Sequence, residues 1–310
     1  MRETPFVDAH VHLWDLARLR YPWLTPPFSE DGPNGSVEPI AHDYRLEDYL
    51  ADLANWNLAG MVHVEAGADP RDALAETEWL EAVAARRGLP NGLVAFAALN
   101  APDVGEQLAR HAANGRVRAI RHIVNWHPDP GRSYTPRDLT RDPAWAAGYA
   151  ELVRHGLSFD LQAYPGQFPG LAALIARHPE TPVAVNHMGM PVESDPDGRA
   201  DWRAGMAALA ALPQVSVKLS GAGFIRRPWS VEAIRPYVLT AIDLFGPDRC
   251  MFASDFPTDA LFGGLDETLD AYATIVAGFS APERAAMWGG VANRHYRLGL
   301  DLGFDLGGVA

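Results

Sequence analysis

Residues 7–14 read Val-Asp-Ala-His-Val-His-Leu-Trp, and this stretch decides how the rest of the chain is interpreted. An apolar start followed by His10-x-His12 predicts a short buried strand, and residues two apart on a strand project from the same face. Two adjacent imidazoles can hold one metal ion, although histidine is also a tolerated interior residue. We therefore expect a strand with a candidate metal site at its carboxyl end.

Seven more strand-like apolar runs follow the first one, which covers 7–13. They lie at 59–65, 93–99, 117–124, 157–163, 182–187, 215–219 and 249–254. The intervals between these runs are long enough for a crossover helix each, which is typical of parallel βαβ units. Eight such units predict an α/β fold, the (β/α)8 TIM barrel, which commonly reaches this size as one domain.

Several of the intervals carry recognisable helix ends. A capping aspartate followed by proline opens two predicted helices, 71–87 and 144–155, and a glycine closes each of them. A serine precedes the predicted helix 231–245, and Ser280 with Glu283 forms a capping-box pattern. These signals support helices between the predicted strands.

We expect one barrel domain over residues 1–310, with two segments that break the alternation. Residues 14–45 are rich in proline and glycine, which predicts a long lid-like loop directly after the first strand. Residues 126–142 predict a second long loop after the fourth strand. Both loops would leave from the C-terminal face of the barrel, where loops carry function. Residues 299–310 predict a C-terminal tail that is either docked or frayed.

Composition and charge narrow the class of protein. The formal net charge of −13 argues against general binding to nucleic acid or acidic membranes. No apolar run approaches the roughly 20 residues that a membrane span needs, and the N-terminus has no signal-peptide pattern. We therefore expect a cytoplasmic protein whose partner is a small-molecule substrate. The sequence leaves the oligomeric state open, a homo-oligomer included.

The barrel prediction indicates which polar residues are candidates for a functional site, because barrel enzymes build their sites at the carboxyl ends of the strands. His10, His12, His187 and Asp255 stand at such ends, on strands one, six and eight. Strand eight adjoins strand one when the barrel closes, so the carboxylate can sit beside the histidine pair. There, Asp255 can either bind an ion or take a proton from water.

Further strand-end residues predict a polar rim that suits a small hydroxylated or carboxylated ligand. Arg121 can bind a substrate carboxylate bidentately, the alternative being an ion pair with Glu65 or Asp160. A lysine that faces the barrel is costly unless it is paired or functional, which favours a pocket role for Lys218. The remaining candidates for substrate binding, or for purely structural contacts, are Glu65, Gln162, Tyr164 and Trp23.

Four stretches of the chain together resemble a known family. They are 7–14, 185–191 (VNHMGMP), 217–221 (VKLSG) and 252–257 (FASDFP). They resemble the amidohydrolase superfamily, and within it the amidohydrolase-2 branch of sugar-acid and dicarboxylate lactonases. The resemblance runs from about residue 5 to residue 298. It implies a distorted (β/α)8 barrel, hydrolysis of a cyclic ester, Asp255 as the base for water, and the three histidines around the carbonyl oxygen or a metal.

The sequence departs from the metal pattern of that superfamily in two places. The usual lysine or glutamate on the fourth strand is not evident, and Gln162 stands at the histidine position of the fifth strand. We therefore expect a mononuclear site for zinc, with manganese as the second choice, rather than a two-metal site. Some lactonases of this branch need no metal, which leaves a metal-free site as the alternative. The three histidines would then polarise the carbonyl directly.

The leading prediction is a hydrolase that opens a small polar lactone, a sugar-acid or dicarboxylate lactone, with water activated by Asp255. The alternative is a metal-dependent non-oxidative decarboxylase of a carboxylated ring, because relatives in the same branch use a similar set of residues. Release of CO2 without a ring-opened acid would identify the decarboxylase. A non-catalytic barrel would explain the fold but not the histidines and the aspartate at the strand ends.

Overall fold

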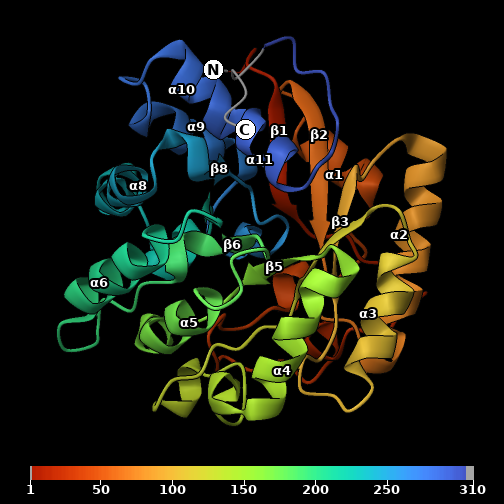
Figure 1. Ribbon diagram of the computed structural model, residues 1–310. Helices are drawn as coiled ribbons and strands as arrows, with labels where there is room; N and C mark the ends of the chain where they lie inside the picture. The colour runs from red at the N-terminus through yellow and green to blue at the C-terminus, as the bar shows by residue number, and fades with distance from the viewer. Residues whose placement is uncertain (1, 305–310) are drawn as a thin grey trace.

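Eight parallel strands form the centre of the protein, whose computed structural model describes residues 2–304 (Figure 1). Neighbours in the chain are neighbours in the sheet, in the order β1 to β8. The strands are β1 (Phe6–Val11), β2 (Leu58–Val64), β3 (Gly92–Phe96), β4 (Val117–Arg121), β5 (Ser158–Leu161), β6 (Val183–Val185), β7 (Val215–Leu219) and β8 (Cys250–Phe252). Each overlaps one predicted run, and the predicted (β/α)8 barrel is confirmed.

The barrel closes just beyond the carboxyl ends of β8 and β1. The backbone N–H of Asp255 donates to the carbonyl of His10 at 2.9 Å, and the N–H of His12 donates to the carbonyl of Phe256 at 2.8 Å. The last strand is therefore joined to the first through residues of the predicted site.

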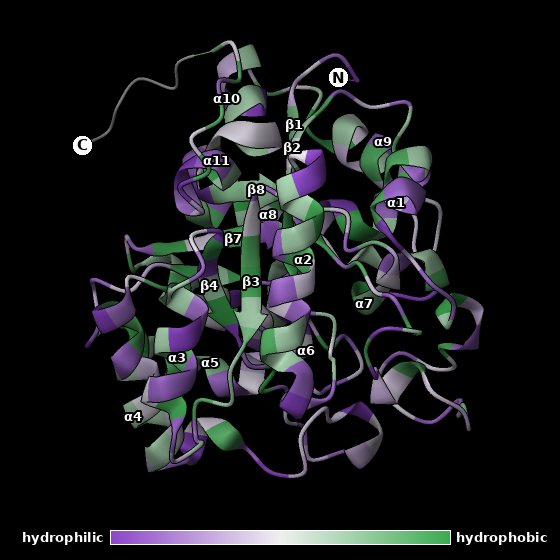
Figure 2. Ribbon diagram, turned by 90° about the vertical axis from the view of Figure 1, so that its right-hand side faces the viewer, coloured by the Kyte–Doolittle hydropathy of each residue, from purple (hydrophilic) through white to green (hydrophobic). Residues whose placement is uncertain are grey.

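Helices cover the outside of the barrel, and hydrophilic and hydrophobic residues alternate along them (Figure 2). They are α1 (Leu46–Asp52), α2 (Ala73–Arg87), α3 (Val104–Ala112), α4 (Pro143–Glu151), α5 (Phe168–Ile175), α6 (Gly198–Ala210), α7 (Ala222–Ile225), α8 (Val231–Phe245), α9 (Leu265–Ile275), α10 (Ala281–Ala285) and α11 (Val291–His295). The predicted helix 231–245 coincides with α8. The predicted helices 71–87 and 144–155 are α2 and α4, each extended by a 3-10 turn.

The chain after α11 packs against the amino ends of the strands. Leu300 and Leu298 lie beside Gly60 and Gly92, where a Cβ would come within 2.5 Å and 2.8 Å of their side chains. Leu302 is also buried in the interior cluster. Residues 299–304 of the predicted tail thus lie against the barrel, and residues 305–310 lie outside the described part.

The only helical elements in the two long loops are short 3-10 turns. In the loop over 14–45, the backbones of Trp14 and Tyr44 exchange hydrogen bonds of 2.8 and 3.1 Å, so its two ends meet. The loop over 126–142 has turns at Pro130–Arg132 and Leu139–Arg141. Both loops start where a strand ends, on the face that holds the site.

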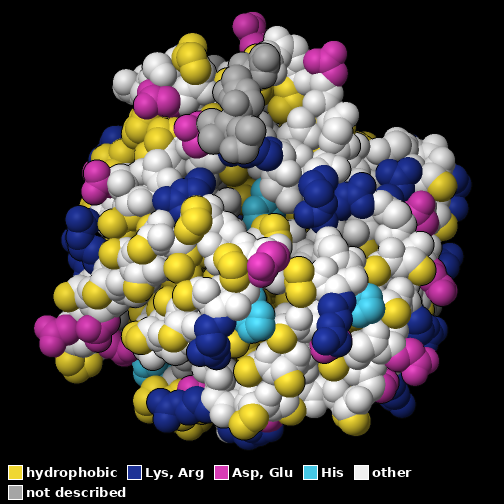
Figure 3. Space-filling model, in the orientation of Figure 1, with side chains coloured by type: hydrophobic (Ala, Val, Ile, Leu, Met, Phe, Trp, Pro, Cys, Tyr) yellow, Lys and Arg dark blue, Asp and Glu magenta, His cyan; other side chains and the backbone are white. Residues whose placement is uncertain are grey.

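Basic and acidic side chains are interspersed over the face of the molecule in Figure 3. Among residues 2–304, no helix has both the length and the apolar character needed to cross a membrane.

The contact between α4 and the chain after β3 generates a stability prediction. A Cβ at Gly148 would lie 1.9 Å from the carbonyl oxygen of Leu99. Because that neighbour is backbone, Gly148→Ala should destabilise the fold by about 3 kcal/mol. Urea and thermal unfolding followed by circular dichroism measure the effect. Gly170→Ala in α5 is the matched control, because its Cβ meets nothing within 4 Å and helix propensity favours alanine by up to about 1 kcal/mol. Equal midpoints for the two variants would contradict the packing argument.

A buried acid at the start of α2 generates a second stability prediction. Burial, reinforced by the nearby Glu65, raises the pKa of Glu76 from 4.5 to about 8. Between these pH values the folded state keeps a proton that the unfolded state releases, so stability should fall as pH rises, by up to about 1.4 kcal/mol per pH unit. Glu76→Gln should flatten this dependence in urea titrations at pH 5 to 8.5. The exposed Glu78→Gln in the same helix should leave the slope unchanged, and a wild-type slope in Glu76→Gln would count against the assignment.

Candidate active site

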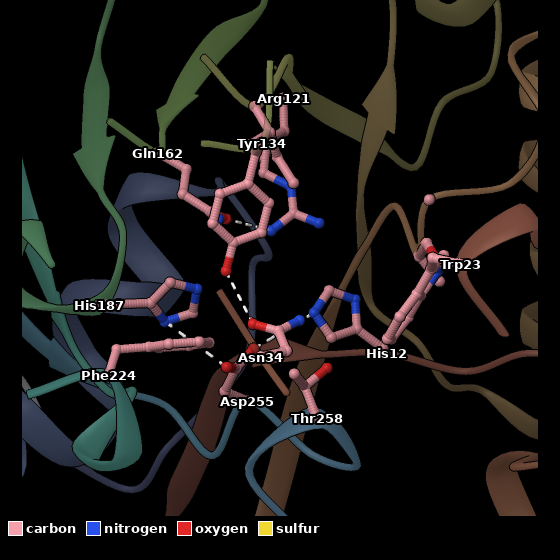
Figure 4. A pocket seen from close by; sticks show the side chains of 13 residues that line it. His12, Trp23, Asn34, Arg121, Tyr134, Gln162, His187, Phe224, Asp255 and Thr258 are labelled. Atoms are coloured by element: carbon pink, nitrogen blue, oxygen red, sulfur yellow. Dashed lines mark hydrogen bonds and ion pairs between the residues drawn. The ribbon is translucent and has the colours of Figure 1, made fainter. Parts of the chain in front are cut away.

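A cavity of about 250 Å³ opens at the carboxyl ends of the strands, and His12, His187 and Asp255 of the predicted metal set line it (Figure 4). His10 is buried beside them and is not part of the cavity wall. The cavity lining combines strand-end residues with residues of the long loops. The lining residues are His12, Trp23, Asn34, Ala66, Gly67, Arg121, Ile123, Tyr134, Gln162, His187, Phe224, Asp255 and Thr258.

Asp255 is the centre of the histidine cluster. Its Oδ1 lies 3.4 Å from His10 Nε2 and 3.3 Å from His12 Nε2, and its Oδ2 lies 3.8 Å from His187 Nδ1. All four side chains are buried. The structure therefore brings together the three imidazoles and the carboxylate that the strand-end argument selected.

The backbone at two of these residues is in the left-handed region, which non-glycine residues rarely adopt. Asp255 has φ 58° and His187 has φ 51°. Conformations of this kind cost free energy and persist where the surrounding structure over-determines them, often at functional sites. Here, the barrel-closing hydrogen bond from the Asp255 N–H helps to hold the residue in place.

The hydrogen bonds of the two β1 histidines assign them different tautomers. His12 Nδ1 donates to the carbonyl of Val64 at 2.8 Å, which leaves the Nε2 lone pair free to face Asp255. His10 Nδ1 lies 3.3 Å from Nζ of Lys218. A lysine ammonium can only donate, so Nδ1 of His10 accepts and its Nε2 carries the proton. His10 is thereby placed to donate toward His12 Nε2 and Asp255 Oδ1.

Burial controls the protonation of the cluster. Desolvation lowers the pKa of His12 to about 3 and that of His187 to about 4, so both imidazoles are neutral at neutral pH. Desolvation also raises the pKa of Asp255, and the neighbouring His187 and Arg121 partly offset that rise. A carboxylate with a raised pKa holds a proton more readily, which suits a general base.

Arg121 forms the ion pair with Glu65 that the sequence left as the alternative to carboxylate binding. Its Nε donates to Glu65 Oε1 at 2.6 Å, and its Nη2 donates to the Glu65 carbonyl at 2.6 Å. Its Nη1 donates to Gln162 Oε1 at 2.9 Å and lies 3.4 Å from His10 Nε2. Arg121 and Gln162 still line the cavity, whereas Glu65 lies behind them.

Lys218 lies inside the barrel rather than along the cavity wall. Its Nζ donates to Asp160 Oδ2 at 2.5 Å, and the Tyr296 hydroxyl donates to Asp160 Oδ1 at 2.9 Å. Lys218 also lies 5.2 Å from the centroid of the Tyr296 ring. The lysine is thus paired, and it reaches the site through its contact with His10.

The two aromatic candidates lie in different places. Trp23 lines the cavity, and its indole N–H donates to the carbonyl of Ala66 at 2.7 Å. Tyr164 is absent from the cavity wall, and its hydroxyl donates to the carbonyl of Arg132 at 2.8 Å, which anchors the loop over 126–142. A substrate contact for Trp23 stays a prediction that its position allows.

Sequence reasoning missed several lining residues, chiefly Asn34, Tyr134 and Phe224. Asn34 precedes a glycine, and that pair predicts only a turn. Tyr134 and Phe224 sit in segments without periodicity, so no sequence signal indicates which way they face. The structure places all three around the mouth of the cavity (Figure 4).

The donor set fits a single divalent ion. Asp255 Oδ2 is buried and has no hydrogen-bond partner among residues 2–304. His10, His187 and Asp255 each place a ligand atom within 4.8 Å of the others, and His12 adds its free Nε2 lone pair. His10 could ligate through Nε2 only with its proton on Nδ1, facing Lys218. The guanidinium of Arg121 beside His10 disfavours a second cation.

Comparison with known proteins agrees with this geometry. The profile of the amidohydrolase family matches residues 7–298. An uncharacterized protein of Sinorhizobium fredii is 40% identical over 96% of this chain and 100% of its own length. The L-fucono-1,5-lactonase of Burkholderia multivorans is 30% identical over 94% of this chain and 96% of its own length.

A solved structure agrees at the level of the fold. The crystal structure of an amidohydrolase from Burkholderia multivorans with bound zinc superposes with a TM-score of 0.77 at 28% identity, covering 95% of this chain and 99% of that one. The barrel, the cluster at its carboxyl end and the family profile agree, and the chain belongs to the amidohydrolase family.

Proposed function

We propose that this protein is a lactonase that hydrolyses a small polar lactone, with a sugar-acid lactone as its substrate. The observation that carries the proposal is Asp255, a buried carboxylate with a raised pKa that faces three imidazoles in a small cavity. The relative named L-fucono-1,5-lactonase, similar over almost the whole chain, supports a cyclic ester as the substrate class.

The size of the cavity supports a small ligand. A volume of about 250 Å³ is below the usual range for drug-sized ligands, about 300 to 1,000 Å³. The polar groups of His12, Arg121 and Gln162 line it, together with the apolar side chains of Ile123 and Phe224. A compact ring with polar substituents suits this lining better than a long acyl chain.

The residues supply the steps of ester hydrolysis. Asp255 accepts a proton as water attacks the carbonyl carbon, and a C–O bond forms while the carbonyl oxygen takes up negative charge. The ring C–O bond then breaks, and the proton held by Asp255 passes to the leaving ring oxygen. The products are the open-chain hydroxy acid and the regenerated carboxylate.

Stabilisation of the developing negative charge falls to the donors around the carbonyl. Arg121 contributes positive charge to the cavity wall, and His10 presents an Nε2–H toward the same cluster. Preorganised donors of this kind are worth several kcal/mol in a water-poor site. A divalent ion held by His10, His12, His187 and Asp255, with the proton of His10 then on Nδ1, would add Lewis-acid polarisation of the carbonyl and lower the pKa of its water.

Substitution of the proposed base tests the mechanism. Asp255→Asn should lower kcat on an aldonolactone at least hundredfold, because the amide cannot accept the proton, while binding of the open-chain acid is retained. A pH-indicator assay measures turnover, and isothermal calorimetry measures binding. Asp243→Asn on the exposed surface of α8 serves as the control. A fully active Asp255→Asn, or release of CO2 without a ring-opened acid, would contradict the proposal.

Removal of metal tests the proposed zinc or manganese ion. If the ion polarises the carbonyl, chelator-treated protein should lose lactonase activity and recover it when zinc or manganese is added back. Bound metal is measured alongside by atomic emission, with His12→Ala as the variant expected to bind less. Full activity in metal-free protein would assign carbonyl polarisation to the histidines and Arg121 instead.

A further inference from the structure

We propose that Asn34 and Tyr134, from two different loops, form a recognition pair for a hydroxyl group of the substrate, so that the cavity selects polyhydroxylated lactones over dicarboxylate lactones. This inference rests on the proposed lactonase function and identifies a ring hydroxyl as the substrate group that the cavity recognises.

The pair forms where the two long loops meet above the cavity. The Tyr134 hydroxyl donates to Asn34 Oδ1 at 2.8 Å, across a sequence separation of 100 residues. Figure 4 shows the Tyr134 hydroxyl directed at the Asn34 side chain among the residues that line the cavity. Each residue also lines the cavity wall, so their polar atoms are within reach of a bound ring.

The chemistry of the pair matches a hydroxyl group. Because Asn34 Oδ1 accepts from Tyr134, the Asn34 Nδ2 group is left as a donor with no partner among residues 2–304. The Tyr134 hydroxyl uses its hydrogen to donate to Asn34, and its oxygen can still accept a hydrogen bond. A free donor beside a free acceptor suits an alcohol, which both accepts and donates, whereas a carboxylate only accepts.

The arginine side chains around the cavity also favour a hydroxyl over a carboxylate as the recognised group. Arg121 uses Nε and Nη2 on Glu65, so the bidentate fork that would hold a second substrate carboxylate is already occupied. Arg227 is likewise engaged, since its Nη2 donates to the carbonyl of Pro33 at 2.7 Å and its Nε donates to the carbonyl of Gly223 at 2.9 Å. The side chain that a dicarboxylate would need as a receptor is therefore committed to the protein.

Arg227 and a small aromatic cluster hold the pair in place. The bond from Arg227 to Pro33 fixes the backbone next to Asn34, and the guanidinium lies 4.1 Å from the centroid of the Phe262 ring. The Tyr134 backbone N–H donates to the carbonyl of Asn125 at 3.0 Å. The Tyr134 ring packs against a small buried cluster of Tyr164, Met190 and Val192. Asn34 and Tyr134 are thus positioned before a substrate arrives, which lowers the entropic cost of binding.

Three lactones test the inference on the full-length protein. L-fucono-1,5-lactone carries ring hydroxyls, δ-valerolactone carries none, and 2-pyrone-4,6-dicarboxylate carries two carboxylates. Wild type should turn over the hydroxylated lactone faster than the dicarboxylate. Asn34→Ala and Tyr134→Phe should each lower kcat/KM for L-fucono-1,5-lactone about tenfold, and leave δ-valerolactone within about twofold. The double variant should lose less than the product of the two single losses, because the residues act as a pair.

Controls separate a recognition role from a structural one. Tyr149→Phe removes a buried hydroxyl that has no hydrogen-bond partner within residues 2–304, and Asn55→Ala removes an exposed amide paired with Asp266. Neither should change kcat/KM, and circular dichroism checks that all variants are folded. Equal losses on both neutral lactones, no loss, or a preference for the dicarboxylate would overturn the inference and leave the lactonase function standing. Wild-type inactivity on all three lactones would overturn the proposed function and this inference with it.

Discussion

The hydrogen bonds that close the barrel between β8 and β1 are the constraint on which the rest of the structure depends. They run from the Asp255 N–H to the His10 carbonyl and from the His12 N–H to the Phe256 carbonyl. The same peptide units carry the side chains of the site. Closing the barrel and assembling the cluster are therefore one event, and any change that opens this seam separates the carboxylate from the histidine pair.

Burial beneath this seam gives the site its electrostatic character. Desolvation keeps the imidazoles of His12 and His187 neutral and makes Asp255 a stronger base. Cations that share the interior are each paired, Arg121 with Glu65 and Lys218 with Asp160. Breaking such a pair on one side would leave an uncompensated buried charge, which is why these side chains stabilise the geometry of the site as well as its charge.

The long loops supply the side chains that cover the cavity. Strand ends place the reacting groups on a rigid scaffold, and the loops over 14–45 and 126–142 bring Trp23, Asn34 and Tyr134 over the cavity. Division of labour between a rigid barrel and variable loops is how one fold supports many substrates. In this protein, hydrogen bonds from Arg227 to the carbonyl of Pro33 and from Tyr164 to the carbonyl of Arg132 hold the loop segments that carry Asn34 and Tyr134.

The sequence by itself determined the fold and indicated the candidate reacting groups. Strand and helix periodicities, with capping signals, predicted the eight βα units, and strand-end position selected His10, His12, His187 and Asp255, because both depend on local patterns along the chain. The tertiary structure decided the remainder. It paired Arg121 with Glu65, turned Lys218 toward Asp160, moved Tyr164 off the cavity wall and brought Asn34 to Tyr134. These outcomes join residues 32 to 100 positions apart, and the long loops have no periodicity to indicate where they fold. Only the three-dimensional structure therefore determines which polar side chain forms a hydrogen bond or ion pair with which partner.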